Sequence, residues 1–408
     1  MKKQLPLLLN FILPAMLLNS IGVVILMLHT SGNIALQSAG WIQPFKDGSV
    51  LVGSIILISF IAKFGYKKAI QAGCIIEIIG CLLMGSFPSL YSAYIFFIMA
   101  GVAFALLKIS IYAAISLVTK NKDTHAGMIS FLEGSFMVAI FIANGLFAWM
   151  IYLQKWYITF YIFAVFGLIA LVSTFYLKLG ETQIASEGPK FLSEYKKALS
   201  LFVQPAIWLF LLLTICYPFI EQGFIDFLPT FQAGVLDVSH SFSVLLAALL
   251  PAMIAIGRLL FSLVVKVLHV KLALFSSIIL AIILMVFALL SAEYAVNYPF
   301  LGYIAMWVLP VIGLFIAPLY PTLNSTILSS QAKNKQSAVT LLIMIFSAIG
   351  ASTGSVLTGY LFTYFGGIKA FSVYIVMLFL IVLLLIPYFL LIDRQTINII
   401  DERSYDPN

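Results

Sequence analysis

Charged residues are scarce in this sequence. Asp, Glu, Lys and Arg make up 9% of the 408 residues, whereas hydrophobic residues make up 63%. Soluble domains carry roughly 25% charged residues, because their surface faces water. The composition therefore excludes an ordinary soluble enzyme or binding domain and indicates a protein that lies largely within a lipid bilayer.

Metal, disulfide and nucleotide signatures are also missing. Cys74, Cys81 and Cys216 lie inside apolar runs, without zinc-type spacing or a disulfide framework. No Gly-rich loop ends in Gly-Lys-Ser or Gly-Lys-Thr, so ATP-driven transport by this chain is not expected. A membrane-embedded enzyme would need His and acidic residues in a cluster. The histidines are instead scattered near predicted loops, at His29, His125, His240 and His269. We therefore expect no catalytic residue, metal or cofactor.

Apolar runs of membrane-spanning length recur along the chain. About 20 apolar residues cross a bilayer as a helix, and long runs such as Phe379 to Leu391 lack the alternation of a β-barrel strand. The N-terminal run resembles a secretory signal, but it continues to about Leu28, beyond the ~7–15 residues of a signal core. We predict twelve helical spans, at 4–28, 42–62, 69–88, 91–118, 127–150, 157–177, 207–229, 241–265, 272–291, 299–328, 337–362 and 370–392.

A polar stretch from Leu179 to Gln204 interrupts the apolar pattern between the sixth and seventh spans. It predicts an all-α membrane protein of two six-helix bundles, residues 1–178 and 207–408, joined by a cytoplasmic linker at 179–206. The C-terminal bundle ends in a short cytoplasmic tail. Secondary transporters built from repeats have this layout, with the solute site between the halves.

The 22 Lys and Arg residues indicate the orientation. If the N-terminus is cytoplasmic, the outer loops hold only Lys155 and Lys369, and three cations lie within spans. The cytoplasmic segments hold Lys2, Lys3, Lys63, Lys67, Lys68, Lys120, Lys122, Lys178, Lys190, Lys196, Lys197, Lys266, Lys271, Lys333, Lys335, Arg394 and Arg403. The positive-inside rule then predicts that both termini are cytoplasmic. The net charge of +7 faces anionic membrane lipid rather than nucleic acid.

Ionisable side chains inside the spans are costly in hydrocarbon, so each is a functional candidate. They are Lys46, Asp47, Glu77, Lys108, Glu133, Glu221, Asp226 and Arg258. Lys46 and Asp47 lie close enough to a span end to reach the interface, and Asp226 is expected at a wet helix end. Glu77 is expected in a structural ion pair. The remaining four lie deeper.

The loop after the second span resembles the signature of the major facilitator superfamily, which is Gly, three residues, Asp-Arg, one residue, Gly and then basic residues. This chain keeps Lys63, Gly65, Lys67 and Lys68. It departs from the signature at Ile58, where the family has Gly, and at Ala62, where the family has an Asp that helps latch the two halves.

The C-terminal half resembles the fucose permease branch of that superfamily, a branch of sugar:proton symporters. Tyr320-Pro321-Thr322 ends the tenth span, and a Gly-rich eleventh span carries Gly350 and Gly354 on a small-residue face. The prolines of the tenth span, Pro310, Pro318 and Pro321, either free carbonyl groups for a cavity or only kink the helix. The branch carries carboxylates in its first and fourth spans, whereas this chain has Asn19 and Lys108 there.

The resemblance also implies roles for individual residues, because spans 1, 4, 7 and 10 line the cavity of the superfamily while spans 5 and 8 meet across the halves. Candidate solute-binding residues are Asn19, Lys108, Tyr112, Tyr217, Glu221 and Asn324. Candidate proton-coupling residues are Glu133 and Glu221. Candidate gating residues are Lys63, Gly65, Lys67, Glu133 and Arg258.

Two pairings of the deep charges are open. Glu133 and Arg258 either pair across the halves and close the inner gate, or Glu133 pairs with Lys108 inside its own half. Lys108 and Tyr112 share one helix face at i, i+4. Lys108 therefore either contacts the solute or forms a purely structural ion pair.

These observations predict a secondary transporter of a small polar solute in the cytoplasmic (inner) membrane, coupled to protons or to sodium. The alternatives are an organic-anion or amino-acid carrier that uses Lys108, and a transport-inactive sensor on the same scaffold. The expected partners are the solute, the coupling ion and membrane lipid.

Overall fold

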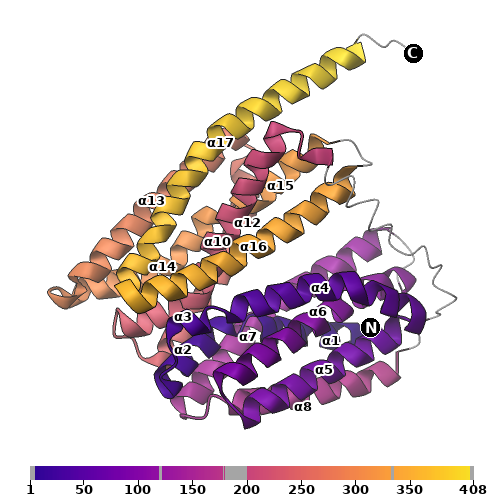
Figure 1. Ribbon diagram of the computed structural model, residues 1–408, viewed down its shortest axis with the longest axis vertical. Helices are drawn as coiled ribbons and strands as arrows, with labels where there is room; N and C mark the ends of the chain where they lie inside the picture. The colour runs from indigo at the N-terminus through magenta and orange to yellow at the C-terminus, as the bar shows by residue number, and fades with distance from the viewer. Residues whose placement is uncertain (1–4, 119–121, 178, 180–199, 332–334, 405–408) are drawn as a thin grey trace. The chain divides into compact units, whose positions relative to one another are not determined.

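A computed structural model describes the backbone of residues 5–118, 122–177, 179, 200–331 and 335–404. Within these ranges it describes all side chains except those of 58–60, 62–63, 116–118, 122–126, 130, 337 and 393–404. The described residues form α-helices, one 3-10 helix and short connections, and no strand occurs among them (Figure 1). The expected all-α membrane fold is therefore confirmed.

The helices follow the predicted spans closely. Up to the polar stretch they are α1 (Leu5–Leu18), α2 (Ile21–Gly32), α3 (Leu36–Ala39), α4 (Ile42–Phe64), α5 (Tyr66–Ser86), α6 (Leu90–Val118), α7 (Lys122–Tyr152) and α8 (Ile158–Phe175). After it they are α10 (Pro205–Gly234), α11 (His240–Ala247), α12 (Leu249–Val264), α13 (Val270–Glu293), η1 (Tyr294–Val296), α14 (Pro299–Ile316), α15 (Leu319–Ser329), α16 (Gln336–Phe365) and α17 (Gly367–Ser404). Each predicted span coincides with one helix or with two consecutive helices.

Ten spans within the described residues are long and apolar enough to cross a membrane, and the bent pair α1–α2, taken as one span, makes eleven. The remaining predicted span, 42–62, corresponds to α4, which has 23 residues and carries Lys46 and Asp47 in its first turns. At 1.5 Å per residue, α4 is about 34 Å long, which is sufficient for a hydrocarbon core of about 30 Å.

Polar side chains or a proline lie at two of the breaks between paired helices. The axis bends by 41° between α1 and α2, where Asn19 Nδ2 donates to the Ala15 carbonyl at 2.9 Å and Ser20 Oγ to the Leu17 carbonyl at 2.7 Å. Such side-chain bonds to preceding carbonyls bend helices. Of the three prolines in the tenth span, only Pro318 lies at a break, between α14 and α15.

The chain divides into two compact units. The first comprises Met1–Pro189 and Asp226–Ala248, and the second comprises Lys190–Ile225 and Leu249–Asn408, so the division falls inside α10. The bundles proposed at 1–178 and 207–408 remain a prediction, and residues 180–199 of the proposed linker lie outside the described residues.

In the first unit, α4 packs on α6, α6 on α5 and α5 on α8. Helix α1 contacts α6, α7 and α8 (Figure 1). Edge-to-face aromatic rings form part of the core, with Phe160 within 5.5 Å of the centroids of both Phe96 and Phe147. Helices α6 and α7 also contact each other, so α1, α6 and α7 meet where the first polar cluster described below lies.

In the second unit, glycines allow two close helix crossings. A Cβ on Gly350 would lie 2.3 Å from the Ile215 carbonyl oxygen, and one on Gly354 would lie 2.3 Å from that of Phe219, so α16 contacts the backbone of α10. A Cβ on Gly257 would lie 2.2 Å from the Leu314 carbonyl oxygen, where α12 crosses α14. The small-residue contact face predicted for Gly350 and Gly354 is confirmed.

Candidate functional site

Lys108 on α6 is the centre of the polar cluster in the first unit. Its side chain is half-buried, and its Nζ lies 5.3 Å from the ring centroid of Phe104 and 5.7 Å from that of Tyr112. Residues 104, 108 and 112 follow one another at i, i+4, so the rings flank the ammonium group on one helix face. Cation–π attraction of this kind contributes about 0.5–2 kcal/mol.

Tyr112 connects α6 to α7. Its hydroxyl donates a hydrogen bond to Oε1 of Glu133. Among the described residues, no carboxylate lies within salt-bridge distance of Lys108, so the direct Lys108–Glu133 ion pair considered as an alternative is not formed. Glu133 instead accepts from Tyr112, which lies one turn further along α6 than Lys108.

Aromatic rings from three helices surround this cluster. Phe11 of α1 lies 5.8 Å from Tyr112 and 5.4 Å from Phe136 of α7, and Phe104 lies 6.3 Å from Phe136, between ring centroids. A wall of this kind lowers the local dielectric constant and strengthens the attraction between an ammonium group and an anion. We call Lys108, Tyr112, Glu133, Phe11, Phe104 and Phe136 the Lys108 cluster.

Glu221 on α10 is the centre of the polar cluster in the second unit. Its Oε1 accepts a hydrogen bond of 2.9 Å from the Tyr217 hydroxyl and one of 3.3 Å from Nη2 of Arg258 on α12. Tyr217 is buried, whereas the side chains of Arg258 and Glu221 are 40% and 23% exposed. The ion pair is therefore accessible to a solute or to water.

Helices α15 and α16 complete this second cluster. The Tyr320 ring stacks on Tyr217 with centroids 5.4 Å apart and planes at 20°, and its hydroxyl lies 3.0 Å from Ser347 Oγ. Asn324, one turn after Tyr320, has a buried Oδ1 for which the described residues provide no hydrogen-bond donor. We call Tyr217, Glu221, Arg258, Tyr320, Asn324 and Ser347 the Glu221 cluster.

The structure thus brings most of the predicted site residues into two groups, one in each unit. Lys108, Tyr112 and Glu133 meet in the first, and Tyr217, Glu221 and Arg258 meet in the second. Glu133 and Arg258 each have a partner within their own unit, so a pair between them stays a prediction. Asn19 joins neither group, since its amide is used at the break between α1 and α2.

The predicted gating loop forms a structural joint of the first unit. Gly65 has a φ of +88°, a backbone conformation that favours glycine, and it separates α4 from α5. Lys67 Nζ donates to the carbonyl oxygens of Phe175 at 3.2 Å and Leu177 at 3.0 Å, at the end of α8. A cation at a helix C-terminus stabilises its free carbonyl groups. The side chain of Lys63 lies outside those that the structure describes.

Two of three further intramembrane acids, Asp226 and Glu77, differ from expectation. Asp226, expected at a wet helix end, is fully buried. Glu77 is buried on α5, and no ion pair or hydrogen bond to its oxygens occurs among the described residues, so the expected structural pair is not found there. Asp47 lies 3.6 Å from Lys46 and accepts a 2.9 Å hydrogen bond from Gln43.

Sequence reasoning identified Tyr112 and Tyr217 as site residues but missed the phenylalanines of the Lys108 cluster and the role of Tyr320. Phe11, Phe104 and Phe136 look like ordinary apolar residues in a chain with 35 phenylalanines. Only the spacing of Phe104 and Lys108 at i, i+4 gives a local signal. The position of Tyr320 beside Tyr217 depends on how α15 and α10 pack, which no short motif specifies.

Comparisons with known proteins agree with this architecture. A bacterial homologue of the human lysosomal transporter Spinster, in an inward-facing and occupied conformation, superposes with a TM-score of 0.75 at 15% identity, over 95% of this chain and 96% of that one. The nucleoside transporter NupG gives 0.74 at 15% identity, over 96% and 98%. A D-xylose–proton symporter gives 0.69 at 15% identity, over 94% and 96%. At these identities the likeness shows the fold alone.

Sequence comparison identifies the family. No curated protein sequence matches the chain, but residues 7–355 match the sequence profile of the Major Facilitator Superfamily. This match covers well over half of the 408 residues. The chain is a multi-pass membrane protein that belongs to the Major Facilitator Superfamily.

Proposed function

We propose that this chain is a secondary active transporter that moves a small organic solute with an anionic group across the cytoplasmic membrane by alternating access. The family and the transporter folds that it resembles support transport rather than enzymatic catalysis. The observation that supports an anionic solute is Lys108, a half-buried ammonium group on a membrane-spanning helix. Aromatic rings lie beside it, and no carboxylate is paired with it among the described residues.

The energetics of Lys108 favour an anionic ligand. A lysine at the centre of a membrane helix costs about 2.5–3.5 kcal/mol by insertion scales, and considerably more in simulations. Two aromatic rings offset only a part of that cost. A carboxylate or phosphate of the solute supplies the missing counter-charge, while Phe104, Phe11 and Phe136 contact its apolar part. An organic anion or an amino acid fits this arrangement better than a neutral sugar of the kind implied by the fucose permease branch.

The Glu221 cluster is the candidate for ion coupling. Protonation of Glu221 would remove its charge and weaken its bond to Arg258, freeing the guanidinium group for another anion. Glu133 is the second candidate, because its protonation would change its bond to Tyr112 beside Lys108. A D-xylose–proton symporter is among the similar structures, which supports a proton in preference to sodium.

The proposal also includes the orientation of the chain in the membrane and a gate on the cytoplasmic side. The distribution of Lys and Arg supports cytoplasmic termini, two six-helix bundles and a cytoplasmic linker. A pair between Glu133 and Arg258 would close the inner side in one state of the transport cycle. Exchange of the two charges, Glu133→Arg with Arg258→Glu, should then restore transport that each single substitution abolishes.

Flux in proteoliposomes tests the function and separates a transporter from a transport-inactive sensor. A thermal-shift screen of purified protein against sugars, amino acids and organic acids first identifies a binder. We expect that an acid or an amino acid raises the melting temperature and accumulates inside vesicles that carry a proton gradient. Binding without flux would indicate a transport-inactive sensor. Stabilisation by neutral sugars alone would contradict the proposal of an anionic solute.

A further inference from the structure

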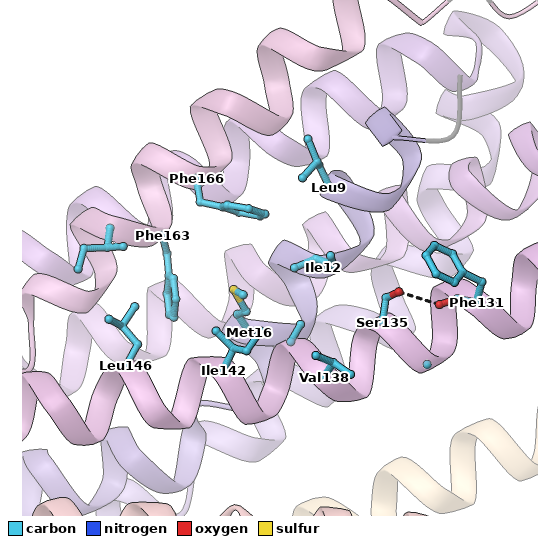
Figure 2. A pocket seen from close by; sticks show the side chains of 13 residues that line it. Leu9, Ile12, Met16, Phe131, Ser135, Val138, Ile142, Leu146, Phe163 and Phe166 are labelled. Carbon is cyan, nitrogen blue, oxygen red and sulfur yellow. Dashed lines mark hydrogen bonds between the residues drawn. The ribbon is translucent and has the colours of Figure 1, made fainter. Parts of the chain in front are cut away.

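A long apolar groove runs along the first unit, separate from the Lys108 cluster. Its floor is formed by Ile12 and Met16 of α1, and its walls are formed by α7 and α8 (Figure 2). Although α7 and α8 are consecutive in the chain, both pack more extensively on α1 than on each other. The resulting gap has a volume of about 780 Å³. We propose that this groove binds one acyl chain of a membrane lipid.

The chemistry of the groove excludes a polar occupant. Apart from Ser135, its lining consists of apolar side chains and Gly134. The Ser135 hydroxyl donates to the Phe131 carbonyl at 2.8 Å, as the dashed line in Figure 2 shows, and is therefore already used within its own helix. A bound water requires two to four polar partners, which this lining does not provide. Only hydrocarbon fills such a space without leaving polar groups unsatisfied.

The length of the groove suits an extended acyl chain. On α7 the lining runs from Phe131 to Leu146, which is about 22 Å at 1.5 Å per residue. An extended acyl chain reaches across about half of the ~30 Å hydrocarbon core, so the groove is long enough to hold one.

The groove also connects the surface of the unit to its core. Val138 and Ile142 on the α7 wall are 59% and 55% exposed, whereas Phe163 and Met16 at its base are buried. The proposal places the open side, between α7 and α8, toward the lipid hydrocarbon that surrounds the outer faces of spanning helices. An acyl chain can therefore enter from the bilayer and lie parallel to α7.

Gly134 is the position at which a larger side chain can be introduced to fill the groove. It lies in the interior of α7, and nothing is within 4 Å of a Cβ built on it. No neighbouring helix therefore requires a glycine there, and a larger side chain would project into open space. Gly145, on the same helix, also has nothing within 4 Å of an added Cβ but does not line the groove. It provides a matched control.

Photo-crosslinking in vesicles tests the proposal. The full-length protein is reconstituted with phosphatidylethanolamine whose acyl chain carries a diazirine, irradiated, digested and analysed by mass spectrometry. We expect label on the groove-lining residues of α1, α7 and α8, loss of that label in Gly134→Phe, and wild-type labelling in Gly145→Phe. Melting temperatures of all three proteins establish that they fold.

Two labelling results would overturn the proposal of a lipid site. One is equal labelling of the groove in Gly134→Phe and the wild type. The other is labelling that follows exposure over every lipid-facing helix without enrichment in the groove. If Gly134→Phe does not fold, Ser135→Phe fills the same space and is judged by the same criteria. A third result would also contradict the proposal. If Ser135→Cys formed a disulfide with a cysteine in a second copy of the chain, protein rather than lipid would cover the groove.

Discussion

The hydroxyl of Tyr112 donates a hydrogen bond to the carboxylate of Glu133 and thereby gives this acid a partner other than Lys108. Lys108 on α6 and Glu133 on α7 do not form a salt bridge with each other. This arrangement leaves the ammonium group of Lys108 with aromatic neighbours and available for a ligand.

Removal of this hydroxyl should weaken solute binding. In Tyr112→Phe, Glu133 loses its donor and can rotate to pair with Lys108, so the solute has to compete with an internal carboxylate. We expect binding to weaken about tenfold, since a bond to a charged group contributes about 1.5 kcal/mol or more. Calorimetric titration of the purified protein measures the change.

The control for this variant is Tyr94→Phe, also on α6. The Tyr94 hydroxyl donates to the Ser38 carbonyl at 2.6 Å, outside the Lys108 cluster. Its removal should leave solute affinity unchanged. Equal effects of the two substitutions would mean that loss of either hydroxyl acts through general destabilisation of α6.

Substitution of Glu221 should uncouple solute transport from the proton gradient. Glu221→Gln keeps the side-chain shape and can still accept from Tyr217, but it neither binds a proton near neutral pH nor pairs ionically with Arg258. We expect exchange of solute across the vesicle membrane to persist while accumulation driven by a pH gradient is lost. A variant that still accumulates solute under a pH gradient would remove Glu221 from the coupling mechanism.

The glycine contact between α10 and α16 should be sensitive to one methyl group. Gly354→Ala places a Cβ only 2.3 Å from the Phe219 carbonyl oxygen, so the helices must separate beside the Glu221 cluster. We expect a loss of about 1–3 kcal/mol in the free energy of unfolding. Gly145→Ala, which has nothing within 4 Å of the added atom, should be neutral or stabilising, and a similar loss there would contradict the packing argument.

Cysteine labelling tests the orientation. Lys369→Cys should react with a membrane-impermeant maleimide added outside intact cells, and Lys335→Cys should react only after the membrane is opened. The native Cys74, Cys81 and Cys216 are buried and give little background. Labelling of residue 335 alone from outside would invert the proposed topology.

The spans were predictable because hydrophobic length is a local property of the sequence. The i, i+4 relation of Lys108 and Tyr112 was predictable for the same reason, as was the small-residue face of Gly350 and Gly354. The partner of Arg258 was not, because the approach of α12 to α10 depends on the packing of helices distant in sequence. The burial of Asp226 likewise depends on neighbours that its own helix does not specify, and three prolines in one span did not reveal that only Pro318 lies at a break.

The most direct test of the account is solute binding by Lys108→Gln, measured together with the melting temperature. Lys46→Gln is the control, because Lys46 is also a partly buried lysine in a spanning helix but lies 3.6 Å from Asp47. We predict that Lys108→Gln loses binding of the anionic solute at an unchanged melting temperature, while Lys46→Gln binds normally. A Lys108→Gln protein that melts at a much lower temperature yet still binds the solute would show that Lys108 is only structural, and would contradict the proposal.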